Sequence, residues 1–341
     1  MATLRSDVII PEIFTPWVIE QATLRDAFLA SGVVQPMAEL NATEGGDVVN
    51  VPFWRANLDG DFEVLSDSAS LTPGKIEGRK QTGVILHRGR AWESRDLAAL
   101  AAGADPMAAI GEKVALYVNH QKQKDLIKCL EGVFGALTGS DSPAFADLRF
   151  DTSGMTALGP RQVAKARSLL GDQGDKINTI AMHSAIFYDL VERKAIEYVS
   201  GAEARITGAA SDGANPDAFA GSVAPAYEQG VTRIPFYMDC RVIVTDDLAP
   251  TSTNYPVYFF TPGAVASGEQ LAMQTETDRD ILAKSDAMSV DLHYCYHPMG
   301  ARWKGASVNP DRSTLATVGN WELVYEKKNV GIVRGTVTSN F

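Results

Sequence analysis

The side chains best suited to chemistry lie on one alternating stretch, SVDLHYCYHP. His293, Cys295 and His297 are spaced two residues apart, so in a strand all three point to the same face. Imidazole and thiolate are common zinc ligands, which makes this set the strongest metal candidate in the chain. The three positions extend over about 13 Å at ~3.3 Å per residue, too far to meet one ion without bending. We therefore expect no metal and a polar strand face, with Asp291 beside it. The opposite face then carries Val290, Leu292, Tyr294 and Tyr296.

Two acidic groups are weaker candidates for chemistry. The run from Asp59 through Asp61 to Glu63 resembles the start of a calcium loop but lacks the remaining ligand positions of an EF-hand. Asp246 and Asp247 could be paired catalytic carboxylates, but neighbouring residues of a strand point to opposite faces. We expect an acidic turn in both places.

The motifs of the commonest soluble enzymes are absent from the sequence. It contains no G-x-G-x-x-G, no G-x-x-x-x-G-K-[ST], no G-x-S-x-G, no C-x-x-C and no H-E-x-x-H. His87 and His183 have no recognisable partner, and we expect a structural role for each. These absences remove the commonest classes of soluble enzyme without excluding an enzyme. Our expectation for the chain as a whole is a protein that is not an enzyme and uses no cofactor. The enzymatic alternative is a cytosolic α/β hydrolase acting through His183 or the Asp291–His297 face, which would need a concave pocket.

Composition and charge narrow the class of protein further. The chain has 341 residues, 45% hydrophobic and 21% charged, which are ordinary globular values. A formal net charge of -11 argues against sequence-independent nucleic-acid binding, but it is compatible with a protein that merely encloses nucleic acid. Three cysteines, far apart in sequence, fit a reducing compartment. Because the sequence has no signal-peptide pattern and no apolar run near the ~18 residues of a membrane span, we expect a soluble protein made in cytosol.

The elements that position these residues are organised around one long helical stretch, residues 98–134. Asp105 is a suitable N-cap, and Pro106 suits the first helical position. A helix of this length would span roughly 40–45 Å, and Gly132 and Gly135 are suited to end it. Its apolar face is formed by residues three and four apart, namely Met107, Ile110, Val114, Tyr117, Val118, Leu126, Leu130 and Val133.

A segment before this helix, residues 1–46, is predicted to be an arm. Its start is extended because it carries two prolines, and a short helix is expected from Ile19 to Leu29. The apolar side chains of the arm need cover, which comes either from another subunit or from the arm's own domain. These side chains are Ile9, Ile13, Phe14 and Trp17.

Residues 47–95 are predicted to form a long β-hairpin whose charges are sorted between its two arms. The outgoing arm is acidic and the returning arm is basic. These charges either pair across the hairpin, or the hairpin lies on a neighbouring subunit of opposite charge. The acidic residues are Asp59, Asp61, Glu63 and Asp67, and the basic residues are Lys75, Arg79, Lys80, Arg88 and Arg90.

The remainder of the chain reads as a mixed globular domain of short helices and strands. We expect a helix from Pro160 to Gly171, a strand over 176–183, and a helix over 184–200 with Ser184 as N-cap. Residues 201–230 are expected to be a surface loop, and 269–285 a solvated helix or loop. Further strands are expected before Asp246–Asp247, over 255–266 and 289–298, and as one or two strands over 321–341.

Three stretches of the sequence, taken with the order of the elements, resemble one known family. The stretches are GVILHRGRAWESRDLAALAAGADPMAAIG, KINTIAMHSAIFYDL, and DCRVIVTDDLAP followed by YPVYFFTPGAVA. The chain resembles the major capsid proteins of tailed bacteriophages with the Hong Kong 97-type fold, over nearly its whole length. The resemblance implies an α+β fold with an N-arm, an extended E-loop hairpin, a P-domain built on a spine helix, and a mixed α/β A-domain.

The resemblance also implies domain boundaries. They are 1–46 for the N-terminal arm, 47–95 for the E-loop, 96–160 for the spine helix and P-domain, 161–300 for the A-domain with a return to P-domain strands, and 301–341 for P-domain C-terminal strands. The apolar residues of the arm and the charged residues of the hairpin are then the expected contacts between subunits.

The function implied by the resemblance is self-assembly into the icosahedral shell around the double-stranded DNA genome of a tailed phage. The expected partners are hexamers and pentamers of the same chain, with scaffold, portal and decoration proteins. The shell would enclose DNA without reading its sequence and without contacting a membrane. The protein would be made and assembled in the host bacterial cytoplasm and would reside in the virion capsid. An encapsulin-type compartment, which shares the fold but packages protein cargo, is the nearest alternative.

Overall fold

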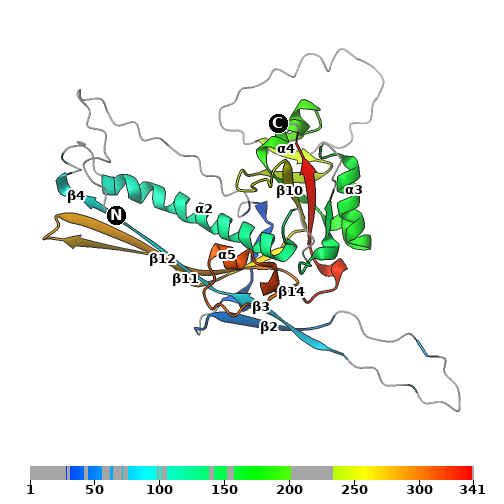
Figure 1. Ribbon diagram of the computed structural model, residues 1–341, viewed down its shortest axis with the longest axis horizontal. Helices are drawn as coiled ribbons and strands as arrows, with labels where there is room; N and C mark the ends of the chain where they lie inside the picture. Colours follow the sequence, from blue (N-terminus) through cyan, green and yellow to red (C-terminus); the bar gives the residue numbers. More distant parts are fainter. Residues whose placement is uncertain are drawn as a thin grey trace.

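The computed structural model describes residues 28, 31–41, 45–55, 62–63, 71, 76–97, 100, 106–137, 142–151, 157–200 and 233–339. Figure 1 shows two regions, a long helix lying beside a long β-hairpin and a larger sheet flanked by shorter helices. The short helix expected from Ile19 to Leu29 and the loop expected at 201–230 lie outside the described residues, apart from Phe28.

The long helix α2 runs from Pro106 to Phe134, which confirms the expected helix and its start at proline. Gly135 follows with a φ of 76°, and its N–H donates to the carbonyl of Glu131 at 2.7 Å, as a glycine after a helix end does. Gly132 does not end the helix but lies inside it. A Cβ at Gly132 would collide with the carbonyl oxygen of Leu315, so glycine there permits close packing.

A four-stranded sheet lies along one side of α2. Its strand order is β1-β11-β12-β4, with β1 parallel to β11 and the other pairs antiparallel. Figure 1 shows that β11, β12 and β4 run roughly along the direction of α2. The strands are β1 (Val34–Pro36), β4 (Leu86–Arg95), β11 (Val265–Asp280) and β12 (Ser285–Pro298).

Strand β11 corrects the expectation of a solvated helix or loop over 269–285. It pairs with β12 as far as Asp280, opposite Ser285. Its outer edge pairs with β1 only through Ser267, so among the described residues the rest of that edge has no strand beside it. A strand with an open edge and an open face can carry mostly polar residues, which is why its sequence lacks the apolar alternation of a buried strand.

The hairpin expected over 47–95 is present at its base. Strand β2 (Val48–Trp54) pairs with β3 (Gly78–Val84) from Val48 opposite Val84 to Trp54 opposite Gly78. The chain then passes directly into β4, which leaves the hairpin and pairs with β12. Near the base lie a small sheet and a short helix, formed by β13 (Ala301–Trp303), β14 (Trp321–Leu323) and α5 (Arg312–Leu315).

The second region is built on a seven-stranded sheet of order β5-β15-β10-β6-β9-β8-β7. Its strands are β5 (Arg149–Asp151), β6 (Thr179–Met182), β7 (Glu197–Ser200), β8 (Arg233–Tyr237), β9 (Cys240–Val244), β10 (Asn254–Phe260) and β15 (Ile332–Thr338). The C-terminal strand β15 therefore pairs in this sheet, between β5 and β10. Helix α3 (Pro160–Leu169) and helix α4 (Ser184–Glu192) flank the sheet.

Helix α4 is shorter than the expected 184–200 helix. Lys194 adopts a φ of 54°, which ends the helical path, and β7 begins at Glu197. The N-cap is His183 rather than Ser184, because the Nδ1 atom of His183 accepts from the N–H of Ala185 at 3.1 Å. The strand expected before Asp246–Asp247 is likewise two strands, β8 and β9, joined by a tight turn at Met238 and Asp239, both with positive φ.

Both regions share one hydrophobic core, and the C-terminal half of α2 is buried in it. Phe134 packs edge-on against Tyr258 of β10, at 5.8 Å between ring centroids. The buried guanidinium of Arg334 on β15 donates to the carbonyls of Gly135 and Ala136 at 2.6 and 3.0 Å. Arg334 therefore ties the C-terminal end of α2 to the seven-stranded sheet.

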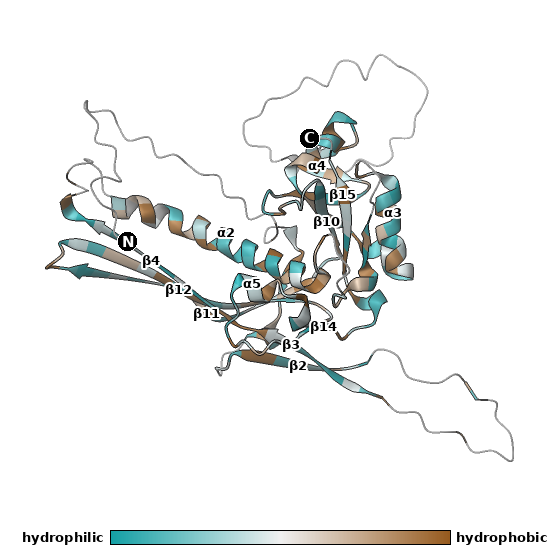
Figure 2. Cartoon of the chain, in the orientation of Figure 1, coloured by the Kyte–Doolittle hydropathy of each residue, from teal (hydrophilic) through white to brown (hydrophobic). Residues whose placement is uncertain are grey.

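Figure 2 shows α2 carrying both hydrophobic and hydrophilic residues along its length. No helix among the described residues is long and apolar enough to cross a membrane. Short 3-10 helices complete the described structure at Ala38–Leu40, Ala146–Leu148, Gly171–Lys176, Val318–Asn320 and Lys327–Asn329.

Candidate subunit-contact site

The alternating stretch singled out in the sequence lies on β12. Its face toward α2 is apolar and buried as expected, and carries Val290, Leu292, Tyr294 and Tyr296. On the other face, Cys295 and His297 are covered by β3, since a Cβ at Gly83 would lie 3.0 Å from the Cys295 sulfur. The Nε2 atom of His297 lies 3.0 Å from the Gln81 side-chain oxygen.

The environment of this face favours neutral side chains. Burial lowers the pKa of His297 to about 4 and raises the pKa of the Cys295 thiol to about 12. Within the described part of the chain, no group of three or more His, Cys, Asp or Glu residues is arranged to hold a metal ion.

The sequence suggests no partner for His87 or His183, but in the fold each of them lies close to another polar side chain. The His87 ring lies on that of His293 at 4.2 Å between centroids, and its Nε2 is 4.0 Å from an Asp47 carboxylate oxygen. The Nε2 atom of His183 is 3.7 Å from a carboxylate oxygen of Asp246.

The adjacent Asp246 and Asp247 form a turn after β9, as expected. A carboxylate oxygen of Asp247 accepts from the Gln123 amide at 2.7 Å and is 3.4 Å from Nδ1 of His120, both on α2. The described polar contacts therefore bind elements to one another and do not converge on an open catalytic pocket.

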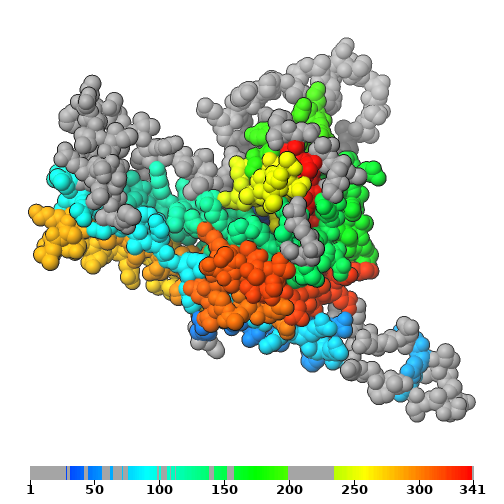
Figure 3. Space-filling model, in the orientation of Figure 1, coloured from blue at the N-terminus to red at the C-terminus, as the bar shows by residue number. Residues whose placement is uncertain are grey.

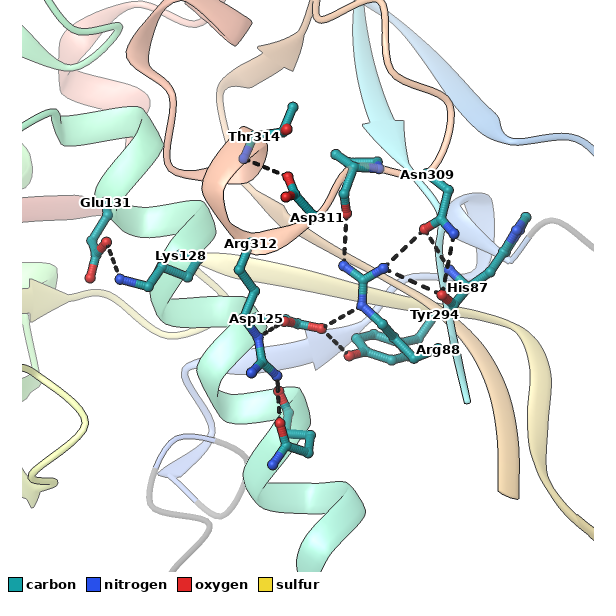
Figure 4. A network of polar contacts seen from close by, with 12 residues as sticks. His87, Arg88, Asp125, Lys128, Glu131, Tyr294, Asn309, Asp311, Arg312 and Thr314 are labelled. Atoms are coloured by element: carbon teal, nitrogen blue, oxygen red, sulfur yellow. Dashed lines mark hydrogen bonds and ion pairs between the residues drawn. The ribbon is translucent and has the colours of Figure 1, made fainter. Parts of the chain in front are cut away.

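A buried carboxylate, Asp125 of α2, is the centre of a polar network (Figure 4). One of its oxygens accepts from Nε of Arg88 at 3.1 Å and from the Tyr294 hydroxyl at 2.6 Å. The other accepts from Nε of Arg312 at 2.5 Å. Arg88 also donates to the carbonyl of Pro310 at 2.8 Å. This network joins α2, β4, β12 and α5, so Arg88, an expected subunit contact, is engaged inside its own molecule.

The network was missed in the sequence, although a signal for it was present. Asp125 lies next to Leu126 on the apolar face of α2, where an unpaired charge would be costly. A charged residue on such a stripe predicts a buried partner, but the partner cannot be identified from helix spacing because Arg88 and Arg312 are distant in sequence.

The remaining expected contact residues fall into two groups. Arg79, Lys80 and Arg90 are exposed, and Arg79 makes a long hydrogen bond of 3.4 Å to the carbonyl of Val324. Glu63 is exposed beside Phe62, whose side chain is 105% exposed and which sequence reasoning did not single out. The others lie outside the described residues: Ile9, Ile13, Phe14, Trp17, Asp59, Asp61, Asp67 and Lys75.

A groove runs between the N-terminal half of α2 and strand β4. It consists of a hollow of about 310 Å³ and an adjoining one of about 170 Å³, both lined by Trp92 and Tyr117. These two rings meet edge-on at 5.3 Å between centroids. The larger hollow is apolar and includes Ile110 and Val114, whereas the smaller one is bordered by Arg90 and the Asp125 network.

Comparison with known proteins gives one curated relative and many structures of the same fold. The chain is 35% identical, over 346 aligned positions, to the major capsid protein of Bacillus phage SPP1, and the alignment covers 96% of each chain. No protein-family model matches the chain.

Solved structures similar to this chain include two phage capsids and an encapsulin. A chain of the cyanophage Pam1 capsid has a TM-score of 0.56 at 14% identity and covers 96% of this chain and 97% of its own. The capsid of Ralstonia phage GP4 gives 0.57 at 9% identity, with coverages of 97% and 96%. The SrpI encapsulin of Synechococcus elongatus gives 0.54 at 8% identity, with coverages of 96% and 94%. At these identities the structures show the fold alone, whereas the phage relative shares 35% identity over nearly the whole of both chains. The chain therefore belongs to the major capsid proteins of tailed bacteriophages and has the Hong Kong 97-type α+β fold.

Proposed function

We propose that this chain self-assembles, as hexamers and pentamers, into a closed icosahedral shell around double-stranded DNA. The observation that carries the proposal is the β2–β3 hairpin of a chain 35% identical to a phage capsid protein. Phe62, between the two strands of this hairpin in the sequence, is a fully exposed aromatic side chain. Such a side chain gains free energy only when another surface covers it.

The proposal includes the division of the chain into N-arm 1–46, E-loop 47–95, spine helix and P-domain 96–160, A-domain 161–300 and C-terminal strands 301–341. The support is the separation between the α2-associated sheet and the seven-stranded sheet. Three strands join these parts, because β11 and β12 return to α2 and β15 pairs in the seven-stranded sheet.

The proposed contacts between subunits are the apolar residues of the arm and the exposed charges of the hairpin. Arg79 and Lys80 represent the basic arm of the hairpin, and Glu63 the acidic arm. Arg88 is withdrawn from the proposed set because it binds Asp125 of its own chain. Many copies of such contacts hold a shell together without any one of them being strong.

We also propose scaffold, portal and decoration proteins as partners, assembly in the host bacterial cytoplasm, and no catalytic activity of the chain itself. The support is the likeness to the phage SPP1 capsid protein. The net charge of -11 suits a shell that encloses DNA without adhering to it, because both carry negative charge.

The proposal is tested by sizing the purified chain, followed by electron microscopy. Closed particles of megadalton size are expected, with nuclease-protected DNA inside those recovered from phage-infected cells. A monomer or small oligomer under all assembly conditions contradicts the proposal. Closed particles that carry protein cargo and no protected DNA would replace it with an encapsulin-type compartment.

A further inference from the structure

Two histidines stack on each other where the β2–β3 hairpin joins the four-stranded sheet. His87 of β4 lies directly opposite His293 of β12 in the antiparallel ladder. Their rings are 4.2 Å apart between centroids, with an angle of 36° between the ring planes. Strand β4 begins at Leu86, two residues after β3 ends, so the pair lies where the hairpin passes into the sheet.

The pair is linked on both sides to the residues that lead into β2. Nδ1 of His293 lies 3.1 Å from the Gln270 side-chain oxygen, and the Gln270 amide donates to the carbonyl of Gly46 at 3.1 Å. Nε2 of His87 is 4.0 Å from a carboxylate oxygen of Asp47. These contacts attach the start of the hairpin to β4, β11 and β12. We call the four side chains His87, His293, Gln270 and Asp47 the histidine latch.

The opposite strand of the hairpin is held by other contacts. Gln81 of β3 lies 3.0 Å from Nε2 of His297 and donates to the Tyr325 hydroxyl. Figure 3 shows β2 and β3, in blue and cyan, at the lower margin of the molecule. Opening of the latch would therefore free the start of β2 while β3 stays in place.

Neutral imidazole suits the closed latch better than imidazolium does. Burial and the nearby His87 lower the pKa of His293 from its ordinary 6.5, and the Asp291 carboxylate opposes them only in part. A proton on His293 places positive charge against a ring 4.2 Å away that can itself carry one. Because both side chains are half-buried, water screens this repulsion less than it does at an open surface. The closed latch is consequently weakened when His293 gains a proton.

The ionisable side chains beside the pair are carboxylates or buried neutral groups. Asp47 can compensate a positive charge on His87, so release depends on His293. Burial raises the pKa of the Cys295 thiol to about 12 and lowers that of His297 to about 4, so both are neutral near pH 6. Arg88 is turned to the α2 side, where it binds a buried carboxylate. Strand β11 and the segment before α5 contribute amides, namely Gln270 and, against the His87 backbone in Figure 4, Asn309.

We propose that the histidine latch is operated by protons: it fastens the start of β2 to the sheet while His293 is neutral and releases it when His293 is protonated. The latch works within one chain, so the inference goes beyond the proposed shell function and does not depend on it. A consequence for assembly does rest on that function. Because the hairpin is the element proposed to act between subunits, a chain with a released β2 should assemble less readily.

Hydrogen exchange of the unassembled chain at pH 7.5 and pH 5.5 tests the latch. The reporter is the Ile85 amide, which donates to the carbonyl of Asp47 at 3.0 Å. An open latch binds a proton that a closed latch does not, and an ordinary histidine goes from about one-tenth to about nine-tenths protonated over this range. After correction for the intrinsic pH dependence of exchange, the protection of Ile85 should fall by up to about tenfold, whereas that of the buried half of α2 should not change.

Two glutamine variants make the test specific. His293→Gln keeps a hydrogen-bond donor for Gln270 but cannot be protonated, so its Ile85 protection should change by less than about twofold. His87→Gln removes the facing ring and should reduce the pH effect. The matched control is His120→Gln, which removes a histidine 3.4 Å from Asp247 and should keep the full pH effect. Circular dichroism checks that each variant is folded.

Several results would overturn the latch. They are an equal loss of protection in His293→Gln and the unmodified chain, or a gain of protection at pH 5.5. If His293→Gln does not fold, an unchanged pH effect in His87→Gln has the same meaning. Assembly is measured separately by light scattering at both pH values, and His293→Gln should assemble better than the unmodified chain at pH 5.5. The expected exchange with no particles at either pH would support the latch and refute the shell function.

Discussion

At the scale of single residues, the Asp125 network places one buried carboxylate between two guanidinium groups. Asp125 is fully buried, while Arg88 and Arg312 remain partly open to solvent. Removing a buried partner leaves the other charges without compensation. We therefore expect Asp125→Asn to lower the free energy of unfolding by about 3 kcal/mol, measured by urea denaturation of the unassembled chain. The control is Asp172→Asn, which breaks an exposed pair with Lys328 and should leave the midpoint unchanged. Equal midpoints for both variants would contradict the role of the network.

A second residue gives the chain a pH-dependent stability. Burial lowers the pKa of His297 from its ordinary 6.5 to about 4, so between these values the unfolded chain binds a proton that the folded chain does not. Stability from this residue is complete above pH 6.5 and is lost as the pH falls toward 4. We expect a loss of about 2 kcal/mol at pH 5, and a smaller loss in His297→Gln, from urea midpoints at pH 7 and pH 5. The same pH slope in both proteins would refute this assignment.

At the scale of elements, substitutions at two glycines of α2 separate the effect of helix propensity on stability from the effect of packing. A Cβ at Gly111 meets no atom within 4 Å, whereas one at Gly132 collides with Leu315 and Trp321. Gly111→Ala should therefore raise the free energy of unfolding by about 0.5–1 kcal/mol, through helix propensity. Gly132→Ala should lower it by about 1–3 kcal/mol, because the short helix α5 must move away. Thermal unfolding of both variants measures the difference, and a stabilised Gly132→Ala would show that α5 yields without cost.

The β2–β3 hairpin is the element expected to act between molecules. Replacing Arg79 and Lys80 together by glutamate should impair assembly while leaving the unassembled chain folded, because both side chains are exposed. Light scattering measures assembly, and circular dichroism measures folding. The matched control is the exposed pair Lys327→Glu with Lys328→Glu, far from the hairpin in sequence. Normal particles from the hairpin variant, or equal damage from the control, would refute the role of the hairpin.

The sequence predicted best those elements whose own residues show the pattern of a helix, a strand or a turn. The start of α2 at Pro106, the strand β12 and the hairpin base all follow from local patterns. The polar half of β11 was missed because an edge strand needs only one partner and little apolar surface. The end of α4 was missed because Lys194 adopts a left-handed conformation that its residue type does not signal.

Contacts between segments that are distant in the sequence could not be predicted, for a different reason. Arg88 was expected at a subunit contact from the charge pattern of its own segment. Its actual partner, Asp125, is fixed by how β4 and α2 pack, which no local pattern specifies. The exposed Phe62 could have been noticed as a lone aromatic residue in an acidic turn.

At the scale of the whole molecule, two electrostatic effects oppose each other during assembly. A net charge of -11 makes subunits repel one another, and at 0.01 M salt this repulsion extends over about 30 Å. At 1 M salt the screening length falls to about 3 Å, which also weakens attraction between contacting charges. We therefore expect assembly yield, measured by light scattering, to be greatest near 0.15 M salt, where the length is about 8 Å. A yield that rises or falls steadily over the whole range would contradict this balance.

The outer edge of β11 has a consequence for the pool of subunits awaiting incorporation. Among the residues that the structure describes, no strand pairs with this edge beyond Ser267, although Glu269 donates its N–H to the Asn41 side chain at 2.9 Å, so a strand of another molecule could add there, as in fibril growth. Glu276, Asp278 and Asp280 line this stretch with negative charge. Two such edges brought together would place like charges side by side, which opposes stacking. We therefore expect these charges to oppose edge-to-edge aggregation of the unassembled chain.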